Sequence, residues 1–379
     1  MVAAYQVRLL DVTGVTIAVF DTWRTLRYAH KLNDPGEFSF VVSGEDARCN
    51  LFEFDGGLEV WRAVPGAAAW YREWAGLVED MDDNVLDNGS HEFVVTGSKP
   101  IGLLGRRDIW WYDGTPQADK SNASAETVIK EYVNENAGPG ALLASDRWAD
   151  GVTAGLSVEV TAGLGYGWDG ARSGRNLLQT IQEIADYSTL GFDMVETAAR
   201  AWEFRVYEGQ PGTDRTTIGL DPATGLNGAG NTPIIFAPEL GNVKSASFQR
   251  RRRGELNAVA VLGQGRSSSR LVVTVDDVVS IGETPLNRRE VSRSGASQNP
   301  TLAELEQIGY EELSKAQYKE QVNFRPMMAA AQFYGVHYFF GDRVTYRGRG
   351  EDYNKRIIAV TATVEGSGES LELEFGDIL

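Results

Sequence analysis

Apolar and polar residues alternate along the C-terminal stretch of the chain, between Phe333 and Asp377. Three pairs of apolar residues, each two positions apart, mark the alternation: Val344 and Tyr346, Ile358 and Val360, and Leu371 and Leu373. A period of two places every second side chain on the same face of a β-strand. Turns rich in glycine and charge separate the pairs, and Gly341-Asp342 forms a tight turn before the first pair. The pattern therefore predicts antiparallel strands with one buried face.

A similar alternation runs through residues 1–105, in short segments that are joined by turns. Glu37-Phe-Ser-Phe-Val-Val42 directly follows Asn33-Asp-Pro-Gly36, which is a strong turn signal. Residues 57–62, 70–79 and 91–98 continue the same pattern. Many short strands with regular turns are typical of a β-sandwich or β-barrel.

Helical periodicity occurs in the middle of the chain and once again later. Ser121–Asn136 and Gly174–Tyr187 each place apolar residues on one side of a helix. Two strands follow the second helix, Leu190–Glu196 and Arg200–Tyr207, so this region is predicted to be an α+β insert. Thr301–Phe324 predicts one long helix, because Thr301 and Glu304 have the spacing of a capping box.

Together these segments predict a mainly β, multi-domain chain with an α+β insert. A glycine- and asparagine-rich loop, Asp221–Thr232, is the best linker candidate. The predicted parts are a first β-barrel or sandwich domain at 1–105, the α+β insert at 106–232, a second β domain formed by 233–265 and 333–379, and a joining region of strand, loop and long helix at 266–332.

Length and composition limit the classes of protein to which the chain can belong. A chain of 379 residues exceeds one typical core, so two to four domains are expected. The net charge of −17 argues against a protein that grips nucleic acid through its phosphates, and favours a solvated surface or one that repels DNA. The single cysteine, Cys49, excludes an intrachain disulfide. No apolar run is long enough to span a bilayer, so no membrane insertion is expected.

Two motifs resemble ligand sites but fail the full pattern. Gly165–Gly170 matches Gly-x-Gly-x-x-Gly, yet the predicted helix starts several residues later and Trp168 would crowd a pyrophosphate, so a plain turn is expected. The acidic run from Glu79 to Asn84 suggests a calcium loop. Counted from Asp80, however, its sixth and twelfth places hold valine and histidine. We expect a solvated hairpin tip there, with adventitious calcium binding as the alternative.

No catalytic, cofactor or metal residues are predicted. The three histidines, His30, His91 and His337, fall in different β segments and outside any catalytic motif. Acidic residues are so abundant that a pair suited to glycoside hydrolysis cannot be identified from spacing. His337 lies among aromatic residues, which indicates a packed or interface histidine.

The sharpest basic feature is the run of four arginines Arg250, Arg251, Arg252 and Arg253. In an acidic protein these residues could pair with acids on a neighbouring subunit or contact a tape-measure protein. They could also touch DNA, or they could form an ordinary solvated strand end or turn.

Four blocks of the sequence, taken in order, resemble siphophage tail hub proteins, the tail-associated (Tal-like) baseplate-hub family that closes the tail tube. The blocks are Asn33-Asp-Pro-Gly36 with Thr96-Gly-Ser98 and Leu103-Leu-Gly-Arg-Arg-Asp-Ile109; Asn176-Leu-Leu178 with Val206-Tyr-Glu-Gly209 and Asp214-Arg-Thr216; Gly241-Asn-Val243 with Asn257-Ala-Val-Ala-Val-Leu-Gly263; and Gly341-Asp-Arg-Val344 with Arg356-Ile-Ile-Ala-Val360 and Phe375-Gly376. The resemblance covers nearly the whole chain.

The resemblance implies a structural virion protein of the tail tip, assembled in the host cytoplasm, that is not an enzyme and carries no cofactor. The two β domains would be tube-type domains, and a homotrimer would supply six barrels that continue the tail tube. Implied partners are the distal tail protein, the tape-measure protein and the tail-tip or receptor-binding proteins.

In this interpretation DNA passes through the lumen of the ring without specific binding, and the hub gates its passage. We expect acidic residues on the lumen and Arg250–Arg253 away from it, because every cation facing DNA adds a phosphate contact. Two alternatives stay open: a β-rich cell-wall glycan hydrolase of the tail tip, and the hub of a contractile injection device.

Overall fold

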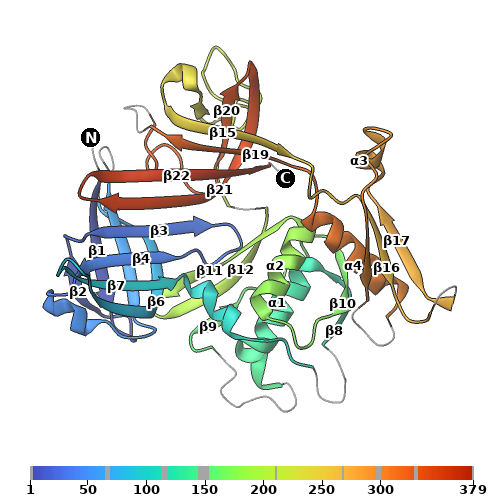
Figure 1. The fold of residues 1–379 in the computed structure, drawn as a ribbon, viewed down its shortest axis with the longest axis horizontal. Coiled ribbons are helices and arrows are strands. Elements are labelled where there is room, and N and C mark those ends of the chain that lie inside the picture. The colour runs from blue at the N-terminus through green and yellow to red at the C-terminus, as the bar shows by residue number, and fades with distance from the viewer. Residues whose placement is uncertain are drawn as a thin grey trace. The chain divides into compact units, whose positions relative to one another are not determined.

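Two units make up the chain, and each combines segments that lie far apart in the sequence. The computed structural model describes residues 3–64, 69–111, 118–143, 153–209, 211–266, 269–295, 300–327 and 332–377. The first unit comprises Met1–Gly102, Pro211–Phe248 and Gln321–Leu379, and the second comprises Leu103–Gln210 and Gln249–Glu320. Strands predominate over helices in the described residues (Figure 1). The predicted class, mainly β and multi-domain with a mixed α and β part, is confirmed.

Within the described residues, a sheet of 14 strands organises the first unit. Strand β15 ends, and strand β19 begins, in residues that are assigned to the second unit. Its strands are β1 (Ala4–Leu10), β2 (Thr16–Phe20), β3 (Thr25–Lys31), β4 (Phe38–Ser43), β5 (Gly57–Ala63), β6 (Tyr71–Val85), β7 (His91–Ser98), β13 (Asp214–Arg215), β14 (Ile235–Phe236), β15 (Val243–Arg251), β19 (Lys319–Pro326), β20 (Arg343–Gly348), β21 (Glu351–Glu365) and β22 (Gly368–Asp377). Short 3₁₀ helices lie at Ala47–Leu51, Pro100–Arg106 and Pro238–Leu240.

Strands from the two ends of the chain meet inside this sheet. The order is β15-β19-β22-β21-β3-β4-β7-β6-β5-β1-β2. Outside this order, β20 pairs with β21, and β13 and β14 pair with β20. Antiparallel pairing of β21 with β3 sets Ala359 opposite Lys31 and Glu365 opposite Thr25. The N-terminal strands and the C-terminal strands are therefore joined by backbone hydrogen bonds into one sheet.

Alternation explains which face of each strand is buried. In β4 the side chains of Phe38, Phe40 and Val42 are buried, while the residues between them are half-buried. The predicted C-terminal strands behave in the same way, since Val344, Val360 and Leu373 are fully buried. Their aromatic and aliphatic side chains pack into a single core with those of β1, β3, β4 and β5. Burying such side chains stabilises a fold by about 1.5–3 kcal/mol each.

The second unit contains the longer helices and three small sheets. Its elements are β8 (Asp119–Ser124), α1 (Ala125–Asn136), a 3₁₀ helix at Pro139–Leu143, β9 (Leu156–Val158), β10 (Gly167–Ala171), α2 (Leu177–Ser188), β11 (Leu190–Ala198), β12 (Ala201–Glu208), β16 (Ala258–Leu262), β17 (Val272–Asp276), α3 (Val278–Gly282), β18 (Glu290–Ser294) and α4 (Leu302–Lys315). The sheets pair β10 with β8, β12 with β11 and β9, and β16 with β17 and β18.

Helix α1 is shorter than predicted at its N-terminal end. The side chain of Ser124 is the N-cap and accepts a hydrogen bond from the Thr127 amide at 3.3 Å. Residues 119–124, of which 121–124 were predicted to be helical, form strand β8 instead, and Asn122 adopts a positive φ of 52°. The helix propensity of this segment gives way to pairing with β10, which lies more than forty residues further along the chain.

Helix α4 has the predicted start but not the predicted end. Thr301 and Glu304 form both hydrogen bonds of the capping box. The helix ends at Lys315, and residues 319–326 form β19, whose Phe324 is buried and stacks on Phe375 of β22. The single long helix predicted for Thr301–Phe324 is therefore wrong. Strand pairing with β22, which follows it by some fifty residues, overrides the local sequence signal.

Helix α4 packs on the sheet of β16, β17 and β18 through a small aliphatic core. Leu305 and Leu313 lie against Val259, Val261 and Val275. Gly309 faces the same sheet, and a Cβ at this position would lie 2.5 Å from the Val275 Cγ2 atom. The glycine is thus required by close packing of helix on sheet.

Candidate functional site

The residues suspected of ligand chemistry do not converge on one site. In the described part of the chain, no group of three His, Cys, Asp or Glu side chains is placed to hold a metal ion. Likewise, none of the described helices has the length and apolar character needed to cross a membrane. His30 contacts Glu73, His91 contacts Glu45 and Asp83, and the ring of His337 lies against Phe333.

The Gly-x-Gly-x-x-Gly segment forms a strand rather than the predicted turn. Gly167–Ala171 is β10, which pairs with β8 and does not open into a helix. Trp168 is fully buried and donates its indole N–H to Glu311 on α4 at 2.8 Å. The segment therefore has a packing role and lacks the strand-to-helix turn of a dinucleotide site.

The acidic run lies on the exposed end of the hairpin formed by β6 and β7. Asp80, Asp82 and Asp83 are exposed, and the hairpin closes between Val85 and His91. The Leu86 amide donates to the Ser90 carbonyl at 2.9 Å, which makes the tip a tight turn. The predicted solvated hairpin matches this geometry.

Two carboxylates flank the imidazole of His91, next to the turn of this hairpin. Glu45 lies 3.1 Å from Nδ1, and Asp83 contacts Nε2. These two hydrogen bonds raise the pKa of His91 above its usual value of about 6.5. Because the folded-state pKa is raised, the contact stabilises the hairpin fully below the unfolded pKa, and this contribution is lost as pH rises through the folded pKa.

We therefore expect the imidazole of His91 to titrate above its ordinary value in the folded protein. NMR titration of the ring protons measures this directly. Glu45→Gln should move the midpoint down towards that of an unperturbed histidine, while Glu208→Gln, on β12, should leave it unchanged. A wild-type midpoint at or below the ordinary value would contradict the expected contacts.

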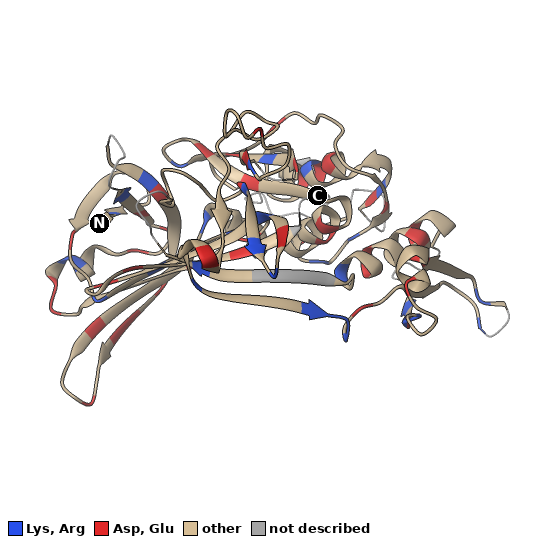
Figure 2. Cartoon of the chain, turned by 90° about the horizontal axis from the view of Figure 1, so that it is seen from above, with Lys and Arg blue, Asp and Glu red and all other residues tan. Residues whose placement is uncertain are grey.

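The four arginines lie at the end of β15 and in the turn after it. Arg250 and Arg251 are the last residues of the strand, and Arg252 and Arg253 follow (Figure 2). Arg252 pairs with Glu283 and lies 3.6 Å from Glu255. Arg250, Arg251 and Arg253 are exposed.

Sequence reasoning missed a buried ion pair inside the first unit. Arg62 of β5 is fully buried and lies 2.6 Å from Glu369 of β22, whose side chain is 3% exposed. Arg62 also donates to the Tyr334 carbonyl at 2.8 Å and to the Tyr71 hydroxyl at 3.1 Å. The Tyr5 hydroxyl donates to Glu369. These contacts join both ends of the chain around one buried charge pair.

The surroundings of this pair are buried and include the further charged pair of His30 and Glu73. Burial raises the pKa values of Tyr5 and Tyr334 well above the usual range, so their hydroxyls stay protonated. Burial alone would also raise the pKa of Glu73, but hydrogen bonding and charge from His30 and the charge of Arg62 outweigh it and lower that pKa. Buried groups of opposite charge held in contact are suited to rigidity. Glu369 also lines a cavity of about 350 Å³, together with Lys244, Arg325 and Glu365 among others.

A second buried pair fastens α4 inside the second unit. The Nη2 atom of Arg172 donates to both carboxylate oxygens of Glu311, at 2.9 and 2.7 Å, and its Nη1 atom donates to the Ala171 carbonyl at 3.1 Å. Glu311 also accepts from Trp168, and both ionic side chains are 5% exposed. Charge-assisted hydrogen bonds of this kind are stronger than bonds between neutral groups.

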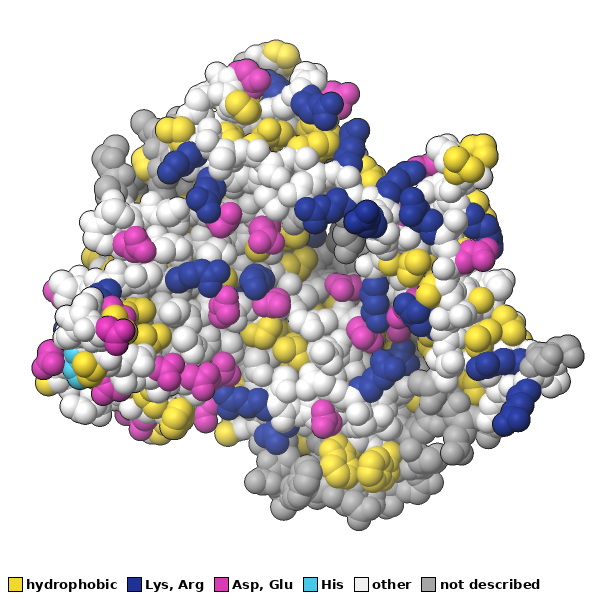
Figure 3. Space-filling model, viewed as in Figure 1, with side chains coloured by type: hydrophobic (Ala, Val, Ile, Leu, Met, Phe, Trp, Pro, Cys, Tyr) yellow, Lys and Arg dark blue, Asp and Glu magenta, His cyan; other side chains and the backbone are white. Residues whose placement is uncertain are grey.

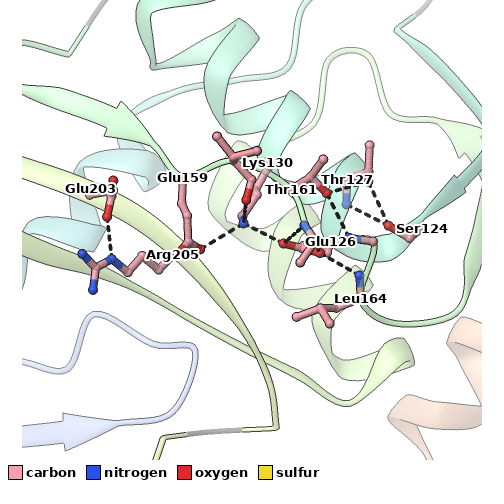
Figure 4. A network of polar contacts seen from close by, with 12 residues as sticks. Ser124, Glu126, Thr127, Lys130, Glu159, Thr161, Leu164, Glu203 and Arg205 are labelled. Carbon is pink, nitrogen blue, oxygen red and sulfur yellow. Dashed lines mark hydrogen bonds and ion pairs between the residues drawn. The ribbon is translucent and has the colours of Figure 1, made fainter.

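A third network holds the segment 159–164 against the start of α1 (Figure 4). Glu126, which is fully buried, accepts hydrogen bonds from Lys130 at 2.6 Å and from the Leu164 amide at 2.6 Å. Lys130 also bonds Glu159 at 3.0 Å. Burial raises the pKa of Glu126, but the Leu164 amide and Lys130 lower it further than burial raises it, so the carboxylate is ionised. The fixed segment presents Val160 with 86% of its surface exposed.

Comparison with known proteins places this architecture among phage tail proteins. Residues 6–377 match the family described as Siphovirus ReqiPepy6 Gp37-like protein. No curated protein sequence matches the chain. The fold resembles the 43 kDa tail protein of prophage MuSo2 from Shewanella oneidensis, at 12% identity and a TM-score of 0.59 over 99% of this chain and 98% of that one.

Two further solved structures share the fold. A tail protein from Neisseria meningitidis MC58 has 13% identity and a TM-score of 0.57, over 100% of this chain and 97% of that one. Prophage tail protein gp18 from Listeria monocytogenes EGD-e has 9% identity and a TM-score of 0.50, over 99% and 94%. At these identities the likeness shows a common fold along nearly the full length of each chain.

Proposed function

The chain belongs to the family of Siphovirus ReqiPepy6 Gp37-like proteins, and we propose that it is the hub at the distal end of a non-contractile phage tail. The family match, which covers residues 6–377, is the observation that carries the proposal. The protein is thus a structural component of the phage tail or baseplate, and the hub role adds its place at the tip.

In the proposed hub, three copies form a ring that continues the tail tube. Each copy contributes two tube-type β domains, 1–105 and 233–265 with 333–379, and the remaining residues form the mixed domain and the joining region. The pairing of β21 with β3 joins strands of both proposed domains in one sheet. Three copies with two such domains each match the six-fold symmetry of a tail tube.

The ring would connect the distal tail protein to the tail-tip and receptor-binding proteins, hold the tape-measure protein and open for DNA. We propose that the lumen is mainly acidic and lets DNA pass without specific binding, since the chain carries a net charge of −17 and like charges repel. The siphovirus family match favours a non-contractile tail over a contractile device.

We expect the purified chain to form a trimer at high concentration or on the tail. Light scattering over a concentration series measures the mass of the particle, and imaging of the tail tip counts the copies. A stable dimer, or a tip with six copies of this chain, would contradict the hub. The competing glycan hydrolase is tested in parallel, since sugar release from purified cell wall that a single acid-to-amide substitution abolishes would replace the hub by an enzyme.

A further inference from the structure

An exposed apolar patch lies on the short helix α3 and the loop that follows it. We call residues 277–289 the α3 knob. Val278, Val279 and Leu286 expose 73%, 78% and 92% of their surfaces. Single exposed apolar side chains are common, but three within nine residues form a patch of the kind that marks an interaction site. Figure 3 shows these hydrophobic side chains at α3, with Lys and Arg side chains beside them.

The α3 knob is held in shape by buried amides. Asn287 is 3% exposed and donates to the Ser280 carbonyl at 2.7 Å. Asn257 is fully buried, donates to the Asn287 carbonyl and accepts from the Arg289 amide. Ser280 donates to Glu255 at 2.6 Å. The patch is therefore preorganised, which lowers the entropy cost of binding.

Positive charge borders the knob. Arg252 pairs with Glu283 of the knob, so the turn that carries Arg251 and Arg253 is attached to it. Arg251 and Arg253 are exposed, and the described residues include no acidic partner for either. A partner for this surface must therefore combine apolar side chains with carboxylates.

The same chain carries such a surface on its β6–β7 hairpin. We call residues 79–92 the acidic arm. Its sequence contains six acidic residues and no lysine or arginine. Its tip exposes 73% of Val85 and 41% of Leu86, and Asp82 and Asp87 are exposed beside them. Figure 3 shows acidic side chains gathered near the histidine at the left edge, where β6 and β7 lie.

We propose that the acidic arm of one copy docks on the α3 knob of a neighbouring copy. Val85 and Leu86 would cover Val279 and its neighbours, and the arm carboxylates would face Arg251 and Arg253. Such a contact joins two different surfaces, so it can repeat from copy to copy until a ring closes. This inference rests on the proposed hub, because the contact requires a homo-oligomer. To that proposal it adds the contact through which the copies would assemble.

Disulfide trapping between two differently sized chains tests the contact. In a Cys49→Ser background, a tagged chain with Leu86→Cys is co-expressed with an untagged chain with Val279→Cys. Mild oxidation should yield a covalent product that contains one chain of each size. The control replaces Leu86→Cys by Val160→Cys, a position that is more exposed (86% against 41%) but lies on neither surface. No mixed product, or an equal yield with the control, overturns the contact.

Charge reversal provides a second test that does not depend on cysteines. Asp82→Lys with Asp87→Lys, or Arg251→Glu with Arg253→Glu, should each weaken self-association at least tenfold at low salt. Mixing the two reversed chains should restore it, while Glu306→Lys on α4 should have no effect. If the trimer forms, but charge reversal does not weaken it and no mixed disulfide product appears, the proposed contact is wrong and the proposed hub is retained. If no oligomer forms on its own or on tails, both fail.

Discussion

Arg62→Met is expected to destabilise the first unit by about 3–5 kcal/mol, the range for removing one partner of a buried ion pair. The substitution keeps most of the aliphatic volume but leaves Glu369 without its cation in a site where its side chain is 3% exposed. The Tyr334 carbonyl also loses its buried donor. The loss is large because the remaining carboxylate cannot regain water without opening the sheet.

Urea unfolding followed by far-UV circular dichroism measures this change. The double variant Arg62→Met with Glu369→Gln should recover most of the stability, because the uncompensated charge is gone and Tyr5 keeps an oxygen acceptor. Arg72→Met is the matched control on the neighbouring strand. The side chain of Arg72, which pairs with Glu59, is 37% exposed, and such surface pairs contribute about 0–1 kcal/mol. Equal losses for Arg62→Met and Arg72→Met would show that the buried pair is not formed.

Glu311→Ala is expected to cost the second unit about 3–5 kcal/mol for the same reason. Arg172 would keep its charge at 5% exposure without its bidentate acceptor, and the buried indole N–H of Trp168 would lose its partner. The packing of α4 against α2 and β10 depends on these bonds, so the transition should also become less cooperative.

Thermal unfolding measures this change, and hydrogen exchange resolved by residue follows the second unit separately, because tryptophans lie in both units. Glu312→Ala is the control, since Glu312 is the next residue of α4 and pairs with Arg293 and Lys315 at the surface. Its loss should stay within about 1 kcal/mol. A smaller effect for Glu311→Ala than for Glu312→Ala would contradict the structural role of the buried pair.

The local features of this fold could be predicted from the sequence, because they depend on residues close in the chain. The capping box of Thr301 and Glu304 joins residues three apart, and its hydrogen bonds form as expected. The strand alternation of Val344, Val360 and Leu373 is likewise a local pattern, and these residues are buried as expected. The family resemblance was stated on short ordered motifs, and the family match covers the same span.

Features that depend on distant partners could not be predicted. Residues 319–326 carry no glycine or proline before Pro326 that would stop a helix, and only pairing with β22 makes them a strand. Arg62 and Glu369 are each one of many charged residues, and no spacing rule links positions so far apart. The α3 knob and the acidic arm could not be predicted either, because the sequence pattern does not distinguish their exposed apolar residues from buried core residues.

The pairing of β3 with β21 also bears on how the chain folds during synthesis. Strand β3 ends at Lys31, whereas its partner β21 begins at Glu351, so the ribosome must complete nearly the whole chain before this ladder can form. Until then the N-terminal strands keep an open edge, which is prone to pairing with other chains. Contacts of such high sequence separation slow folding, and a domain interrupted by another leaves the inserted residues free to fold first. We expect residues 103–210 and 249–320 to acquire protection from hydrogen exchange before residues 25–31 do, and overproduced chains that terminate before Glu351 to aggregate.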